Sequence, residues 1–107
     1  MKVQFICTSP VETDGWLLGA HRFETAFTVG NVLLVANAPT GGDVEFELHE
    51  DEVATGVTIT LASGLTVASL TSVHVVPVGV VAQWRCIDAP ADPSTSTSNV
   101  SLVMGQG

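Results

Sequence analysis

Apolar and polar side chains alternate along short segments of this chain, and that alternation restricts its fold more than any other feature. In the clearest segment, residues 44–49, the apolar side chains share one face of an extended strand and the polar ones share the other: Val44, Phe46 and Leu48 against Glu45, Glu47 and His49. A strand with this pattern has one face in the core and one in solvent. We therefore expect His49 on the solvent side.

Similar β-branched segments recur through the chain, separated by glycine and proline. We predict strands at residues 3–7, 22–28, 32–36, 44–49, 57–61, 65–70, 71–76, 80–87 and 100–104, with a shorter one at 16–18. Turns are predicted at 30–31, 38–42, 62–64 and 77–79, an acidic loop at 50–56, and a low-complexity loop at 88–99. No segment shows helical periodicity, and turn signals about every 8–12 residues are typical of a β-sandwich or barrel.

Residues 1–107 are thus predicted to form a single all-β domain of about eight antiparallel strands, since this length suits one domain. Residues 1–14 are expected to supply either the first strand or an N-terminal docking arm. Met1 looks like a natural start, which predicts a complete small protein.

The charge of the chain excludes several classes of partner. Three Lys and Arg against eleven Asp and Glu give a net charge of −8. Binding to nucleic acid or to an anionic membrane needs a clustered basic surface, so we expect neither partner. No segment approaches the ~20 apolar residues of a membrane span, and the first residues lack the apolar stretch of a signal peptide. The 46% hydrophobic content also excludes a disordered acidic tail.

The residues that could carry chemistry are few and scattered. Cys7 and Cys86 lack C-x-x-C spacing, so two buried free thiols are expected, with a disulfide between them left open. His21, His49 and His74 form no metal-binding motif, and no G-x-S-x-G segment is present. We therefore predict no catalytic residue, no cofactor and no metal ligand.

Acidic residues cluster around one turn: Glu45, Glu47, Glu50, Asp51 and Glu52. They are expected to form a solvated negative face, and a weak cation site is left open because no calcium-loop motif is present. Trp84 alternates with polar residues and is predicted in the core. Trp16 follows Asp14 and Gly15 and is expected to be partly exposed, where it could contact a partner or a glycan.

The predicted strand at residues 32–36 is apolar on both faces, and a second group of valines has the same character: Val73, Val75, Val76, Val78, Val80 and Val81. Such a strand is buried on both faces, or buried on one and docked on a partner with the other. The predicted partner contacts are Trp16, Val32, Leu34, Val73 and Val75. In so small a domain we expect some of them to lie in an interface between identical subunits.

One stretch goes beyond a generic β pattern, residues 19–48, which contains Gly19-Ala20-His21-Arg22-Phe23 and Ala38-Pro39-Thr40-Gly41-Gly42. The segment Asn99-Val100-Ser101-Leu102-Val103-Met104 would then be the closing strand. Over residues 19–107 the chain resembles a small β-sandwich domain of tailed-phage structural proteins. The resemblance implies a jelly roll and, frequently, a trimer. The chain departs from the family at His49–Gly56, where members often have a tight hairpin, and at Pro77-Val78-Gly79.

Members of that family serve as head decorations, head fibres and tail-fibre modules, and they share no catalytic centre. The resemblance therefore implies a virion protein that binds the major capsid protein or another virion protein, with no enzymatic activity. The expected role is that of a capsid decoration or cement protein. A head- or tail-fibre component and a carbohydrate- or receptor-binding module are the alternatives.

Overall fold

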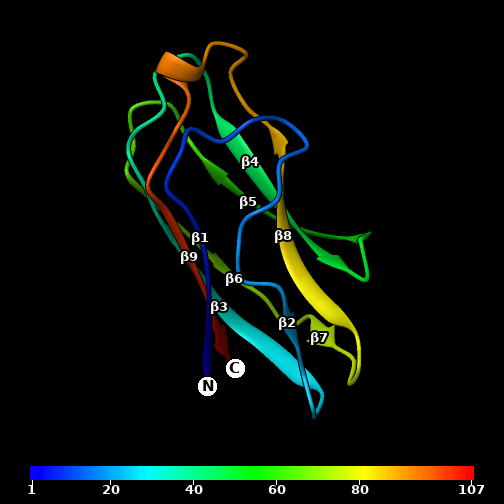
Figure 1. Ribbon diagram of the computed structural model, residues 1–107. Helices are drawn as coiled ribbons and strands as arrows, with labels where there is room; N and C mark the ends of the chain where they lie inside the picture. The colour runs from blue at the N-terminus through cyan, green and yellow to red at the C-terminus, as the bar shows by residue number, and fades with distance from the viewer.

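The computed structural model describes all 107 residues. About 53% of them lie in strands and none in an α-helix, and two antiparallel sheets pack against each other (Figure 1). The all-β class and the sandwich of two antiparallel sheets are therefore confirmed. The two ends of the chain lie beside each other at one end of the molecule.

The first sheet has the strand order β1 (Lys2–Cys7), β9 (Val100–Gln106), β3 (Phe27–Val35) and β6 (Val67–Thr71). A short strand, β7 (Val75–Val76), pairs with the beginning of β3. Residues 2–7 thus form the first strand, one of the two alternatives expected for the N-terminal segment.

The second sheet has the order β2 (His21–Arg22), β8 (Val81–Asp88), β4 (Val44–Glu50) and β5 (Val53–Leu61). The loop between β8 and β9 contains one turn of 3₁₀-helix, η1 (Pro93–Thr95). Asp92 caps this turn by accepting a hydrogen bond from the Ser94 backbone N–H, which lowers the pKa of its carboxyl group.

The core lies between the sheets and is built from alternate residues of each strand. On β4 and β8 the expected alternation is confirmed, since the apolar side chains at every second position point inward: Val44, Phe46, Leu48, Ala82, Trp84 and Cys86. From the first sheet, Phe5, Leu34 and Leu102 pack against them. This single cluster holds the two layers together through apolar burial.

Two segments in the N-terminal half differ from the secondary structure that the sequence predicts. Residues 22–28 do not form one strand, because β2 ends at Arg22 and β3 begins at Phe27. Phe23 and Phe27 instead stack inside, with ring centroids 4.4 Å apart. The predicted turn at 30–31 is also wrong: β3 runs through it with a bulge between Val29 and Asn31.

The predicted acidic loop at 50–56 is wrong as well, because the chain reverses in a two-residue turn. Glu50 pairs with Val53, and the two residues between them, Asp51 and Glu52, have φ values of 50° and 67°. Two successive positive φ angles define a type I′ hairpin turn. The turn is anchored by Asp51, whose Oδ1 accepts a hydrogen bond from the Val81 N–H at 2.9 Å.

His49 is 4% exposed, so the prediction that it faces solvent is wrong. The β4–β8 register is regular here, so His49 keeps its outward position beside Gln83, and it is buried because Trp16 covers that face. The Trp16 ring then packs against the imidazole in an edge-on arrangement, with centroids 5.0 Å apart.

Candidate functional site

The five predicted partner contacts do not come together in the fold. Val32 and Leu34 are 0% exposed and belong to the core, so they cannot contact a partner in the folded chain. The bulge at Gly30 resets the alternation of β3 and turns these two side chains inward. The exposed apolar residues of this strand are their neighbours Leu33, at 46%, and Val35, at 44%.

Val73 and Val75 are exposed, as their predicted role requires. They lie in and beside β7, which pairs with the other end of β3, at Phe27 and Thr28. Trp16 lies instead against the second sheet, where it forms a bridge to Arg85 of β8. Trp16 and the two valines, Val73 and Val75, therefore lie at separate places on the surface.

The surroundings of Trp16 leave its ring partly covered. The Arg85 guanidinium carbon lies 5.1 Å from the ring centroid, a cation–π contact. Arg85 is itself held by Asp14, through an ion pair of 3.4 Å and a hydrogen bond to the Asp14 backbone carbonyl. Because a glycan needs a free ring face on which to stack, this arrangement disfavours Trp16 as a sugar platform.

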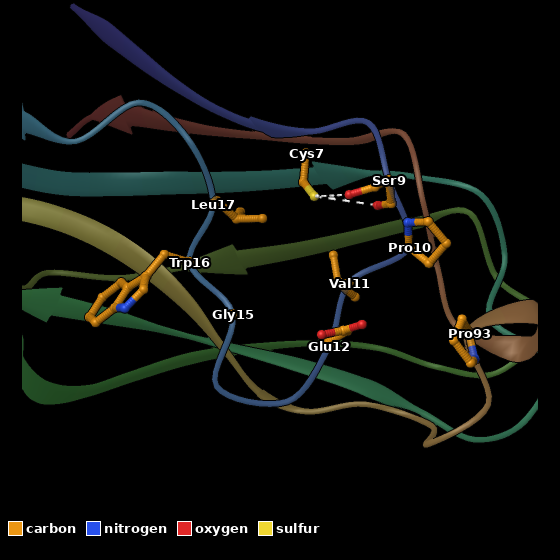
Figure 2. Close-up of a pocket in the computed structure, with 9 residues that line it drawn as sticks. All are labelled: Cys7, Ser9, Pro10, Val11, Glu12, Gly15, Trp16, Leu17 and Pro93. Atoms are coloured by element: carbon orange, nitrogen blue, oxygen red, sulfur yellow. Dashed lines mark hydrogen bonds between the residues drawn. The ribbon is translucent and has the colours of Figure 1, made fainter.

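A hollow of about 360 Å³ lies beneath the segment between β1 and β2. Figure 2 shows that the Trp16 ring extends away from the side chains of Cys7, Ser9 and Pro10, which border the hollow at its other end. The Cys7 thiol donates to the Ser9 carbonyl at 3.3 Å. This partner is no base, so it does not activate the Cys7 thiol as a nucleophile.

Both cysteines are free thiols, and Cys86 is buried as expected, while Cys7 is half-buried. Burial raises the pKa of the Cys86 thiol from its ordinary value of 9.0 to about 11. At neutral pH this thiol is protonated and enclosed, which describes a structural cysteine and not a reactive one.

Two acidic residues of the second sheet, Glu47 and Glu50, contact different partners. Glu50 Oε1 lies 3.1 Å from His74 Nε2, and Glu47 Oε2 accepts a hydrogen bond from the Gly56 N–H. No group of three His, Cys, Asp or Glu side chains gathers in a geometry that could hold a metal ion.

A further candidate surface is the outer face of the first sheet, which the sequence did not single out. It consists of the outward-pointing residues of four strands in register: Lys2, Gln4 and Ile6 of β1; Ser101, Val103 and Gly105 of β9; Asn31, Leu33 and Val35 of β3; Val67, Ser69 and Thr71 of β6. Val103 lies beside Leu33, and Val35 beside Val67. These contacts make a continuous apolar strip in solvent, a feature typical of an interaction site.

A readable signal for this face was present in the sequence. Asn31, Leu33, Val35 and Asn37 share one parity, and asparagine at both ends of the set indicates the exposed side. The pairing of β1 with β9 widens the face and joins the two ends of the chain. No local sequence pattern predicts this pairing.

Neither a scan against models of protein families nor a search of curated proteins finds a match for this chain. The structure contains no helix with the length and apolar character needed to cross a membrane.

Proposed function

We propose that this chain is a structural protein of a tailed-phage particle, a capsid decoration protein that works by binding and not by catalysis. The observation that carries the proposal is the apolar strip of Leu33, Val35, Val67 and Val103 on an exposed sheet face. A rigid sandwich with such a face suits attachment to neighbouring subunits, because flat apolar area is lost from water on docking. The proposed partners are further copies of the chain and the major capsid protein, within the virion.

We also propose that the sandwich is a jelly roll. A jelly roll forms when a long antiparallel ribbon of eight strands, paired 1–8, 2–7, 3–6 and 4–5, wraps into two sheets. Leaving out the two-residue β7, this chain has the pairs β1–β9, β2–β8, β3–β6 and β4–β5. The tight turn at Asp51 and Glu52 also supports the resemblance to the phage domains. Members of that family often have a tight hairpin at this place, where the sequence predicts a longer loop.

The alternative roles receive less support from the geometry. A carbohydrate-binding module using Trp16 would have to displace Arg85 from the ring. A head- or tail-fibre component would use the same kind of sandwich, and it differs from a decoration protein in how many copies a particle holds.

The proposal is tested with shells that lack this protein, assembled from the major capsid protein of the phage that encodes it. Purified chain is titrated onto the shells, and bound protein is measured after sedimentation. We expect saturable binding at a fixed ratio to the capsid subunit. A chain that stays in the supernatant, or that saturates at a few copies per shell, contradicts a decoration role.

A further inference from the structure

We propose that the outer face of the first sheet docks on the same face of a second copy of this chain, related by a two-fold axis. The inference rests on the proposed function, in that it specifies which surface joins copies to one another. It differs from the trimer that the resemblance implies, and it is carried by the charge and shape of this face.

The charge of the molecule is segregated between its two sheets. None of the eleven acidic side chains lies on β1, β3, β6, β7 or β9, and the only charged side chain of the outer face is Lys2. The carboxylates lie on the second sheet, on its hairpin and in the loops: Glu12, Asp14, Glu24, Asp43, Glu45, Glu47, Glu50, Asp51, Glu52, Asp88 and Asp92.

This segregation selects the second copy as the occupant. Two molecules of net charge −8 repel each other wherever carboxylates meet. A contact between two outer faces keeps every acidic side chain of the strands out of the interface and points the acidic sheets away from each other. A contact between unlike surfaces would place this apolar face against an acidic one and leave carboxylates desolvated.

The shape of the face is complementary to itself. At one end lies an open hollow of about 500 Å³, lined by Met1, Lys2, Asn31, Leu33, Val103, Gly105 and Gln106, where Gly105 contributes no side chain. At the other end Ile6, Val35 and Val67 project into solvent. Along the strand direction, Gly105 lies to one side of the Leu33–Val103 pair, and Val35 lies to the other side.

A two-fold axis lying in the interface and crossing the strands at the level of Val103 and Leu33 brings these ends together. The projecting apolar end of each copy then meets the hollow end of the other, as a self-complementary two-fold interface requires. The same operation places Leu33 of one copy against Leu33 of the other, near the axis.

The area of the face sets the strength that we expect. Four strands about 4.8 Å apart and seven residues of about 3.3 Å each span roughly 19 by 23 Å. Two such faces bury on the order of 1,000 Å² in total, at the lower limit of specific interfaces. The pair should therefore be weak in dilute solution and favoured at the high local concentration of an assembled particle.

The test is sedimentation velocity on the full chain, with any affinity tag removed because both termini lie at the end of this face. Over a range from about 10 μM to about 1 mM, we expect a shift from monomer to dimer. The shift should occur at lower protein concentration in high salt, because screening weakens the repulsion between two acidic molecules. A chain that is monomeric throughout, in low and high salt, overturns the proposal.

Substitutions locate the interface. Leu33→Glu places two carboxylates at the axis, and Gly105→Leu fills the hollow; both should abolish the dimer. A Cβ at Gly105 would meet only the Asn31 carbonyl oxygen at 3.5 Å, so the fold tolerates this change, and thermal unfolding checks it. Val73→Glu is the matched control, since Val73 is 86% exposed and lies between β6 and β7, outside the strands that form this face, and it should leave dimerisation unchanged. The reverse pattern overturns the proposal.

Proximity at the axis is tested independently by oxidation. In a Cys7→Ser background, Leu33→Cys should form a disulfide-linked dimer under mild oxidant, while Val73→Cys should not. A trimer, or equal cross-linking by both variants, contradicts the two-fold pair. Binding to shells by a strictly monomeric chain would overturn this inference and leave the proposed function standing, whereas a dimer that binds no shell would do the opposite.

Discussion

At the scale of single residues, β3 separates core from surface within one peptide unit. Leu34 is fully enclosed between the sheets, while Leu33 lies on the outer face beside Val103. The two leucines are chemically identical, and only the alternation of an extended strand gives them different roles.

Truncation of each leucine should reveal this difference. We expect Leu34→Ala to lower the free energy of unfolding by about 2–5 kcal/mol, because it leaves a cavity in the core. Leu33→Ala should cost about 1 kcal/mol or less, since Leu33 is 46% exposed and its truncation leaves no enclosed cavity. Urea denaturation of dilute protein provides both values, and equal losses would contradict the assignment of faces on β3.

The buried thiol of Cys86 should make stability depend on alkaline pH. Its pKa is raised to about 11 in the folded chain, so the folded state keeps the proton after the unfolded chain has lost it. The stabilisation is full below the ordinary value of 9.0 and is lost as pH rises toward 11. The free energy of unfolding should fall by about 1.4 kcal/mol per pH unit within that window.

Cys86→Ala is the control for this effect, because the variant lacks the titrating group. Denaturation at several pH values from 8 to 11 should give a steeper decline for the natural chain than for the variant. Parallel curves would show that Cys86 ionises equally well in the folded and unfolded chains.

At the scale of elements, the hairpin between β4 and β5 carries an unusual turn sequence. A type I′ turn favours Asn-Gly, because both central residues need positive φ. Here Asp51 and Glu52 occupy those positions, and the second has a φ of 67° without the freedom of glycine.

Glu52→Gly should therefore stabilise the protein. Relief of the left-handed strain, about 1–2 kcal/mol, outweighs the extra flexibility of the unfolded chain, about 0.5–1 kcal/mol, so a net gain of about 0.5–1 kcal/mol is expected. Thr58→Gly, in the adjoining strand, should have the opposite sign. A loss of stability in Glu52→Gly, measured by thermal or urea unfolding, would contradict the turn geometry.

These elements show which features the sequence could predict. The alternation of β4 and β8 was readable because both strands bury one face against the core. The break after Arg22, the bulge at Gly30 and the turn at Asp51 were not, since each depends on long-range packing or on an uncommon turn pair. The glycine at position 41, within the Ala38–Gly42 motif, also depends on long-range packing, because a Cβ there would clash with Thr95 Oγ1.

At the scale of the whole molecule, the candidate surface comes from strands that are distant in sequence. Leu33 and Val35 could have been assigned to it from their parity with Asn31 and Asn37. Its width could not, because β1 and β9 join opposite ends of the chain through the pairing of Lys2 with Gly105. The net charge was evident from composition, whereas its confinement to one sheet and the loops required the fold.

We propose this sandwich as a structural subunit of a phage particle. The most direct test is its copy number in purified particles of the phage that encodes it, measured by quantitative mass spectrometry against the major capsid protein. A decoration protein should be present in many copies, in a fixed simple ratio to the capsid subunit. Absence of the chain from the particle would contradict the account.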